Sequence, residues 1–285
     1  MDAETAADPE QTQTDSADAP AEDDSVPEDR LLSSRTSFSV AAKAALLIDL
    51  NTGRAVYEQD ADEQVYPASL TKIMTCLLAL ENGNLSDTVT ITENAYADLV
   101  SGSSTADLQV GEQLRLEDLL YCMMVESGNE AANAVAEYIG GTIEDFVKMM
   151  NERAYELGCT HTHFMNPHGL HNESHYTTAR DLSLIVQAAL KSENFRTITN
   201  TAEYTLPATN LSDERVLKTT NMLIFQNSGN RYYYPKAIGI KTGYTTPAGR
   251  CVISAAKSSG MYLLGIICGA ETTVLETGDI QMESF

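Results

Sequence analysis

The order of the apolar segments along the chain sets the strongest limit on its fold. Strand-like segments occur at residues 44–50 and 54–57, and again near the other end, at residues 232–242, 250–257 and 261–268. The segments between these two groups have helical periodicity instead. The simplest way to bury both groups is one antiparallel sheet built from both chain ends, with a helical lobe inserted between them. We therefore predict an α+β fold in which helices flank this sheet.

Apolar residues recur at helical spacing in five segments of the middle region, at residues 69–81, 116–125, 130–139, 143–157 and 178–190. The last segment opens with Thr178 and Asp181, the spacing of a capping box. Of the 285 residues, 43% are hydrophobic and none is Trp, so the chain can bury a large, mostly aliphatic core. This length corresponds to one large domain or two small ones.

The first 30 residues differ sharply in composition from the rest. They hold 11 Asp or Glu, a single basic residue (Arg30) and no aromatic residue. Such a segment buries too little apolar surface to offset the entropy lost on ordering. We predict that residues 1–38 form a disordered acidic linker and that residues 39–285 form the folded body.

The net charge of the whole chain is −23. A chain this acidic has no basic surface for phosphates, so it excludes non-specific nucleic-acid binding and electrostatic docking on an anionic membrane. No leader is visible at the start, and no apolar run is long enough for a transmembrane helix. The chain is therefore either cytoplasmic or lacks a leader that has been removed, and the polar linker ahead of the body favours the second.

The cysteines and histidines do not form a recognisable metal or disulfide pattern. The five cysteines include no Cys-x-x-Cys, and their apolar neighbours indicate small buried hydrophobic residues. Clustered histidines can bind zinc, and a zinc peptidase is therefore an alternative. The cluster contains no His-Glu-x-x-His and spans a predicted turn, which favours a structural loop. Its members are His161, His163, His168, His171 and His175.

Ser69 and Lys72 form a Ser-x-x-Lys motif at the start of a predicted helix. A helix N-terminus offers free N–H groups to an oxyanion, and residues three apart share a face, so the Lys72 amine can reach the Ser69 hydroxyl. A lysine can activate a serine only when burial or another cation lowers its pKa. The same spacing at Ser254 and Lys257 lies on a predicted strand, where these side chains point to opposite faces. We therefore predict Ser69 as nucleophile and Lys72 as base.

Two further motifs support this reading. Ser127-Gly-Asn129 lies between two predicted helices, where the Ser127 hydroxyl can relay a proton to a leaving amine and Asn129 can orient Lys72 and a substrate carbonyl. A second Ser-Gly-Asn, at residues 228–230, lies in a polar segment that we expect to be a loop.

Lys241-Thr-Gly243 lies on a predicted strand. Lys241 can supply a second cation, and Thr242 a hydroxyl for a substrate carboxylate. Gly243 leaves room for a peptide at the strand edge. We expect the Tyr244 N–H to act with the Ser69 N–H as the oxyanion donors.

In this order, the three motifs resemble the penicillin-binding and serine β-lactamase superfamily. Pro67-Ala-Ser69-Leu-Thr-Lys72 together with Ser-Gly-Asn is similar to the low-molecular-weight D-alanyl-D-alanine carboxypeptidases. The resemblance covers residues 42–271. Other stretches that carry it are Ala45-Leu-Leu-Ile-Asp-Leu-Asn-Thr-Gly53, Asn166-Pro-His-Gly-Leu170, His175-Tyr-Thr-Thr-Ala-Arg-Asp181 and Gly239-Ile-Lys-Thr-Gly-Tyr244.

The resemblance implies a β-lactamase/transpeptidase-like fold and a serine D,D-carboxypeptidase. Such an enzyme removes the terminal D-Ala of peptidoglycan stem peptides through an acyl-enzyme, is inhibited by β-lactams, and uses no metal or other cofactor. It acts outside the cytoplasmic membrane. Residues 39–285 would be its penicillin-binding catalytic domain, without the closing helix, second domain and membrane anchor that relatives often carry. Arg250 follows the Lys-Thr-Gly strand where some β-lactamases bind a carboxylate, although it can equally be an ordinary strand residue.

Two other functions remain open at this point. A serine β-lactamase would need fast deacylation, for which the chain lacks the Glu-x-x-Leu-Asn element of class A enzymes. A non-catalytic penicillin-binding sensor or scaffold would bind penicillin without releasing D-Ala. The three motifs also serve carboxypeptidases and endopeptidases alike.

Overall fold

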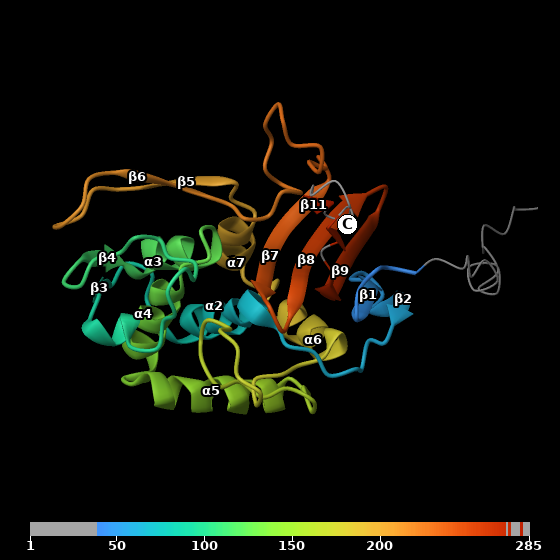
Figure 1. Cartoon of the computed structure of the whole chain (residues 1–285), viewed down its shortest axis with the longest axis horizontal. Helices are drawn as coiled ribbons and strands as arrows, with labels where there is room; N and C mark the ends of the chain where they lie inside the picture. The colour runs from blue at the N-terminus through green and yellow to red at the C-terminus, as the bar shows by residue number, and fades with distance from the viewer. Residues whose placement is uncertain (1–38, 272, 275–279, 282–285) are drawn as a thin grey trace, which may run out of the picture. The chain divides into compact units, whose positions relative to one another are not determined.

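The computed structural model describes residues 39–271, 273–274 and 280–281 (Figure 1). The predicted acidic linker, residues 1–38, lies outside the described residues. So do most residues after 271, where a closing helix was expected to be missing. The body contains a five-stranded sheet, a helical lobe and several short two-stranded ribbons.

The central sheet is antiparallel and has the strand order β2-β1-β9-β8-β7. Strands from the beginning and the end of the body meet where β1 pairs with β9, which confirms the predicted architecture. β7 begins at residue 237 rather than at the expected 232, because Pro235 has no N–H for a strand ladder and the preceding residues form turns. The strands are β1 (Ala44–Asp49), β2 (Arg54–Gln59), β7 (Ala237–Thr245), β8 (Gly249–Ser258) and β9 (Met261–Ala270).

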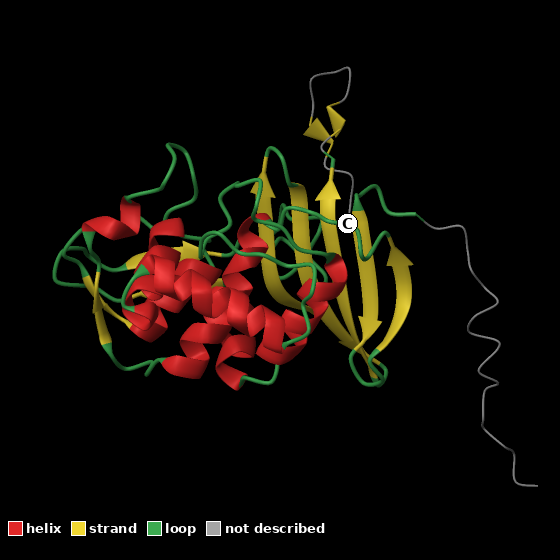
Figure 2. Cartoon of the chain, turned by 90° about the horizontal axis from the view of Figure 1, so that it is seen from below, coloured by secondary structure: helices red, strands yellow, loops and turns green. Residues whose placement is uncertain are grey.

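The helical lobe follows the predicted segments closely. Figure 2 shows the helices gathered to one side of the sheet. The expected helix over residues 69–81 is a 3₁₀ turn, η1 (Ala68–Thr71), that leads into α2 (Lys72–Asn82). The other helical elements are η2 (Glu93–Tyr96), α3 (Leu116–Met124), α4 (Asn129–Gly140), α5 (Ile143–Glu156), α6 (Ala179–Ala189) and α7 (Glu193–Thr199).

Helix α2 lies at the centre of the core. Its residues from Lys72 to Ala79 are all buried, and it packs against α3, α4, α5, α6 and α7. Removing so many aliphatic side chains from water fixes the position of this helix. The first turn of α2, and with it Ser69, is therefore held rigidly between the lobe and the sheet.

One of the two hydrogen bonds of the predicted capping box forms at the start of α6. The Thr178 hydroxyl accepts a hydrogen bond from the Asp181 N–H at 3.0 Å, so one of the free donors of this helix is satisfied. The Asp181 carboxylate does not close the box; it accepts bonds from the His161 N–H and the Thr162 hydroxyl. These contacts tie the histidine-containing loop to α6.

Short ribbons account for most of the elements that the sequence did not predict. They are β3 (Thr88–Thr90), β4 (Gln113–Arg115), β5 (Glu203–Leu206), β6 (Arg215–Lys218), β10 (Thr273–Val274) and β11 (Ile280–Gln281). The β5–β6 hairpin is anchored to the lobe by an ion pair of 2.8 Å between Arg215 and the fully buried Glu112. The chain then runs from β6 past the sheet edge at residues 219–223.

The five cysteines are buried free thiols, as their apolar neighbours predict. In the part of the chain that the structure describes, no helix combines the length and apolar character needed to span a bilayer.

Candidate functional site

Ser69 and Lys72 lie within hydrogen-bond distance at the junction of η1 and α2. The distance between Lys72 Nζ and Ser69 Oγ is 3.1 Å, as the three-residue spacing predicts. The residue before the serine, Ala68, has φ of +48°, a conformation that non-glycine residues rarely adopt. Such local strain is typical of residues held in place for function.

The Lys72 amine is completely buried and surrounded by acceptors. Besides Ser69, its Nζ contacts Asn129 Oδ1 at 2.6 Å and the His168 carbonyl oxygen at 2.8 Å. Burial and the nearby charge of Lys241 hold the pKa of Lys72 well below its usual range. A lysine in this state can carry a free electron pair near neutral pH and accept the Ser69 proton.

The second motif meets the third across the same cavity. Ser127 lies between α3 and α4 with φ of +67°, and Lys241 Nζ donates to its Oγ at 3.0 Å. Lys241 also donates to the Thr242 carbonyl oxygen at 2.9 Å. Burial lowers the pKa of Lys241 to about 7, so this amine can both give and take a proton at neutral pH.

The second Ser-Gly-Asn and the second Ser-x-x-Lys lie outside this site. Residues 228–230 form a turn, as expected, and Ser254 lies on β8 with its hydroxyl donating to the Ile238 carbonyl oxygen. Lys257 lies over the Tyr262 ring, 4.3 Å from its centroid. Neither motif therefore brings a serine and a lysine together as Ser69 and Lys72 are.

Gly243 packs directly against the backbone of the nucleophile. A Cβ atom at this position would lie 2.8 Å from Ser69 N and 3.1 Å from Ala68 Cβ. Real Cβ contacts are essentially never shorter than 3.0 Å, so only glycine lets β7 approach η1 this closely. The edge of β7 and the Ser69 N–H therefore border one space, where an oxyanion hole is expected.

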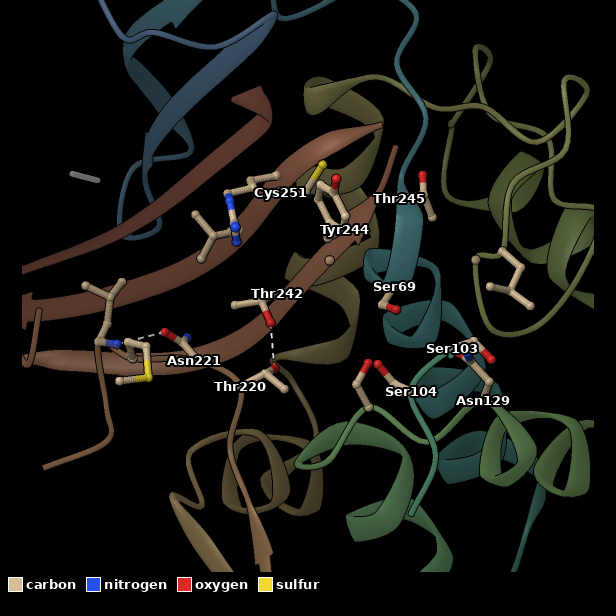
Figure 3. A pocket seen from close by; sticks show the side chains of 18 of the residues that line it. Ser69, Ser103, Ser104, Asn129, Thr220, Asn221, Thr242, Tyr244, Thr245 and Cys251 are labelled. Carbon is tan, nitrogen blue, oxygen red and sulfur yellow. Dashed lines mark hydrogen bonds between the residues drawn. The ribbon is translucent and has the colours of Figure 1, made fainter. Parts of the chain in front are cut away.

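A pocket of about 520 Å³ lies between the lobe and the sheet (Figure 3). Seven of the nine predicted site residues line it directly: Ser69, Ser127, Asn129, Thr242, Gly243, Tyr244 and Arg250. The other two, Lys72 and Lys241, are buried beside it and reach Ser69 and Ser127 with their amines. The structure thus brings together residues that are up to 181 positions apart in the sequence.

Arg250 is the one charged residue among those that line the pocket. It lies on β8 opposite Tyr244 of β7, and its guanidinium is 5.4 Å from the centroid of the Tyr244 ring. A carboxylate-binding role for Arg250 stays a prediction.

Several pocket residues were not predicted from the sequence. The hydroxyls of Thr220 and Thr242 are 2.5 Å apart, and the Thr220 N–H donates to the carbonyl oxygen of Val125, shortly before Ser127. Figure 3 also shows Ser103 and Ser104 beside Ser69, on the opposite side of the opening from Thr242. These residues lie in loops without periodicity, so the sequence carried no signal for them.

The two buried histidines support the loop that carries them. His168 Nε2 is 2.9 Å from Asp98 Oδ2, and its Nδ1 accepts the Leu170 N–H at 3.1 Å. His175 Nε2 is 2.9 Å from the Thr71 hydroxyl, and burial lowers the pKa of this histidine to about 3. Among the described residues, no three His, Cys, Asp or Glu side chains are arranged to hold a metal ion. These contacts agree with a structural loop.

Comparison with known proteins gives a single family. The model of the D-alanyl-D-alanine carboxypeptidase family, peptidase S11, matches residues 32–272. The chain is 39% identical over 236 residues to the D-alanyl-D-alanine carboxypeptidase DacF of Bacillus subtilis, which covers 81% of this chain and 58% of that protein. DacA of Escherichia coli is 35% identical over 242 residues, with coverage of 82% and 57%. The chain therefore spans less than two thirds of the length of these relatives.

Solved structures agree with this result. The crystal structure of the Streptomyces K15 DD-transpeptidase superposes with a TM-score of 0.76 at 34% identity, and covers 83% of this chain and 93% of that one. A D-alanyl-D-alanine carboxypeptidase from Mycobacterium tuberculosis has a TM-score of 0.73 at 30% identity, with coverage of 83% and 85%. The chain belongs to the D-alanyl-D-alanine carboxypeptidase family.

Proposed function

We propose that this protein is a serine D,D-carboxypeptidase that removes the terminal D-Ala from peptidoglycan stem peptides. The observation that carries the proposal is the contact of 3.1 Å between Ser69 Oγ and the amine of Lys72, a lysine with no exposed surface. Burial and a neighbouring cation favour the neutral amine, which is the form that can activate a serine.

In the acylation step, Lys72 takes the proton of Ser69 while the serine oxygen attacks the carbonyl carbon between the two D-Ala residues. Negative charge then develops on the carbonyl oxygen. The N–H groups of Ser69 and Tyr244 stabilise this oxyanion at the space that Gly243 leaves open. Asn129 holds Lys72 in place through its Oδ1 and faces the substrate from the pocket wall.

The leaving D-Ala needs a proton on its amine. Ser127 is the donor, and Lys241, 3.0 Å from the Ser127 hydroxyl and with a pKa of about 7, replenishes that proton. Water then hydrolyses the acyl-enzyme and frees Ser69. Penicillin reacts by the same first step, because its amide carbonyl is attacked by Ser69 in the same way.

The substrate ends in a carboxylate, and the charges of the pocket suit it. Lys241 and Arg250 supply positive potential, and the Thr242 hydroxyl supplies a donor. The net charge of the chain is −23, yet no acidic residue is among those that line the pocket. We infer that the acidic exterior is unrelated to the chemistry of the site.

The setting of this reaction is outside the cytoplasmic membrane, where peptidoglycan is located. The relatives bear the name D-alanyl-D-alanine carboxypeptidase, which supports the same substrate class for residues 39–285 as a penicillin-binding catalytic domain. The partners are the stem peptide and, as inhibitors, β-lactams.

The test measures D-Ala release from diacetyl-Lys-D-Ala-D-Ala by wild type, Ser69→Ala and Ser254→Ala. We expect release by wild type and by Ser254→Ala, whose serine lies on β8, and none by Ser69→Ala. Rapid nitrocefin turnover without D-Ala release would indicate a β-lactamase instead. Penicillin labelling of Ser69 without D-Ala release would indicate a sensor or scaffold, and activity in Ser69→Ala that a chelator abolishes would indicate a zinc peptidase.

A further inference from the structure

Glu130 is a completely buried carboxylate that the proposed reaction does not use. It follows Asn129 in the first turn of α4. Its Oε1 accepts the N–H of Ala106 at 2.5 Å and, at 3.5 Å, that of Leu108. Its Oε2 has no hydrogen-bond partner among the described residues. A buried carboxylate with one unpartnered oxygen is costly, so its presence beside an active site calls for a physical reason.

One consequence of Glu130 is mechanical. Through Ala106 and Leu108, it fastens the segment of residues 102–108 to the beginning of α4. The same junction is closed by the Asn129 N–H, which donates to the Ser104 carbonyl oxygen at 3.0 Å. Gly128 completes the junction, because a Cβ there would lie 3.2 Å from both Ala106 and Glu130 Oε2. The carboxylate therefore fixes the pocket wall formed by Ser103 and Ser104 relative to Asn129.

A second consequence is electrostatic. Lys72 has two strong influences that lower its pKa, burial and the charge of Lys241, and the negative charge of Glu130 opposes them. Burial raises the pKa of Glu130, and its backbone hydrogen bonds favour the ionised form. In its ionised form, Glu130 therefore opposes the positive charges of the two buried lysines.

We propose that Glu130 is a positioning residue for the Ser69 reaction. Its carboxylate fastens the 102–108 segment to the beginning of α4 and places a negative charge directly after Asn129, whose Oδ1 contacts the Lys72 amine at 2.6 Å. This inference rests on the proposed function, because it assumes that Lys72 is the base that activates Ser69.

Several other titratable groups surround Glu130 and Lys72. His168 faces Lys72 through its carbonyl oxygen, and its ring is paired with Asp98. The charge of Glu130 also acts on Tyr96 of η2 and Cys122 of α3, and Asp107 lies in the fastened segment. Burial raises the pKa of Tyr96 to about 12 and raises that of Cys122 as well, so both stay neutral between pH 5 and 9. Lys241, whose pKa is about 7 and whose charge acts on Lys72, also titrates in this interval, so the profile reports on the two lysines together. The difference between Glu130→Gln and Glu112→Gln isolates the part that Glu130 contributes.

The experiment compares Glu130→Gln, Glu130→Ala and the control Glu112→Gln. Gln at 130 keeps an oxygen for the Ala106 N–H but has no charge, whereas Ala removes both. Glu112 is an equally buried carboxylate of the same lobe that accepts the Gln109 N–H at 2.8 Å, but it is paired with Arg215. The readout is the second-order rate of Ser69 acylation by fluorescent penicillin from pH 5 to 9, with the melting temperature of each variant.

Glu130 raises the pKa of Lys72, so its neutral replacement lowers this pKa further and leaves more of Lys72 unprotonated at acid pH. We expect the acid limb of the acylation profile to move to lower pH in Glu130→Gln by about 0.5–1 unit, and to stay in place in Glu112→Gln. Glu130→Ala should acylate at least roughly tenfold more slowly than Glu130→Gln at every pH.

An unchanged acid limb in Glu130→Gln, or an equal movement in Glu112→Gln, would overturn the electrostatic part. Equal rates for Glu130→Ala and Glu130→Gln would overturn the mechanical part. If Glu130→Ala does not fold, the near-isosteric Glu130→Gln still decides the role of the charge. Failure of wild type to acylate at Ser69 would instead refute the proposed function, so the two failures are distinguishable.

Discussion

Replacing Gly243 by Ala tests whether the close approach of β7 to the nucleophile matters for catalysis. The added Cβ would lie 2.8 Å from Ser69 N, 3.1 Å from Ala68 Cβ and 3.3 Å from Leu70 N. Two of these are backbone atoms, and Ala68 precedes a helix whose first eight residues are buried. Neither β7 nor η1 can relieve these contacts by rotating a flexible side chain. The strand and η1 must therefore separate by several tenths of an ångström.

This separation acts on the place where the oxyanion is expected. Loss of one oxyanion donor slows acyl transfer by about 10²–10³-fold, equivalent to about 3–4 kcal/mol. Inserting a methyl group into a packed site destabilises a protein by about 1–3 kcal/mol. We expect Gly243→Ala to lose roughly 10²-fold in acylation rate, with a moderately lower melting temperature. The loss in acylation rate would thus be larger than a decrease in the folded fraction of the protein could explain.

The assay is the second-order rate of labelling by fluorescent penicillin, together with thermal unfolding. The matched control is Gly265→Ala on β9 of the same sheet, where a Cβ would have its nearest neighbours at 3.7 and 3.8 Å, ordinary contact distances. That variant should keep nearly full labelling. Labelling of Gly243→Ala within about threefold of wild type would refute the steric argument for this glycine.

Two further predictions concern Thr220, which lines the pocket, and Lys241, which is buried beside it. Thr220→Val removes the hydroxyl that lies next to that of Thr242. The lost hydrogen bond is worth about 1 kcal/mol, so kcat/KM for D-Ala release should fall about fivefold. An unchanged kcat/KM would contradict this. Lys241 titrates near pH 7 in the folded protein and near 10.5 when unfolded, so the unfolded chain holds the extra proton between these values and stability rises with pH there. Lys241→Met should reduce this increase in the free energy of unfolding with pH by up to about 1.4 kcal/mol per pH unit, as measured by urea unfolding at pH 7, 8 and 9. Equal increases in wild type and Lys241→Met would contradict the low pKa of Lys241.

Long, strongly periodic segments were predictable from the sequence, since local patterning alone defines them. The α3, α4, α5 and α6 helices and the strands of the central sheet follow their predicted spans to within a few residues, apart from the beginning of β7. The short ribbons were missed because two to four residues are too few to establish a period. Their pairing also depends on partners far along the chain, as in β5–β6 and its anchor between Arg215 and Glu112.

The site was predictable where chemistry and local spacing coincide. Ser69 and Lys72 are three residues apart on a helical turn, and each of the other motifs is a short run with its own chemical logic. Thr220 was not predictable, because its role depends on a tertiary contact with Thr242. Glu130 was equally hidden, since an acidic residue after Asn129 looks like an ordinary first-turn helix residue. Only the structure shows that it is buried and bonded to residues 106 and 108.

The central claim is that Ser69, activated by Lys72, forms the acyl-enzyme. Its most direct test is peptide mapping by mass spectrometry after incubation of the intact protein with penicillin. The account predicts one penicilloyl adduct, on Ser69, that is absent from Ser69→Ala. An adduct on any other residue of wild type, or equal labelling of Ser69→Ala, would contradict it.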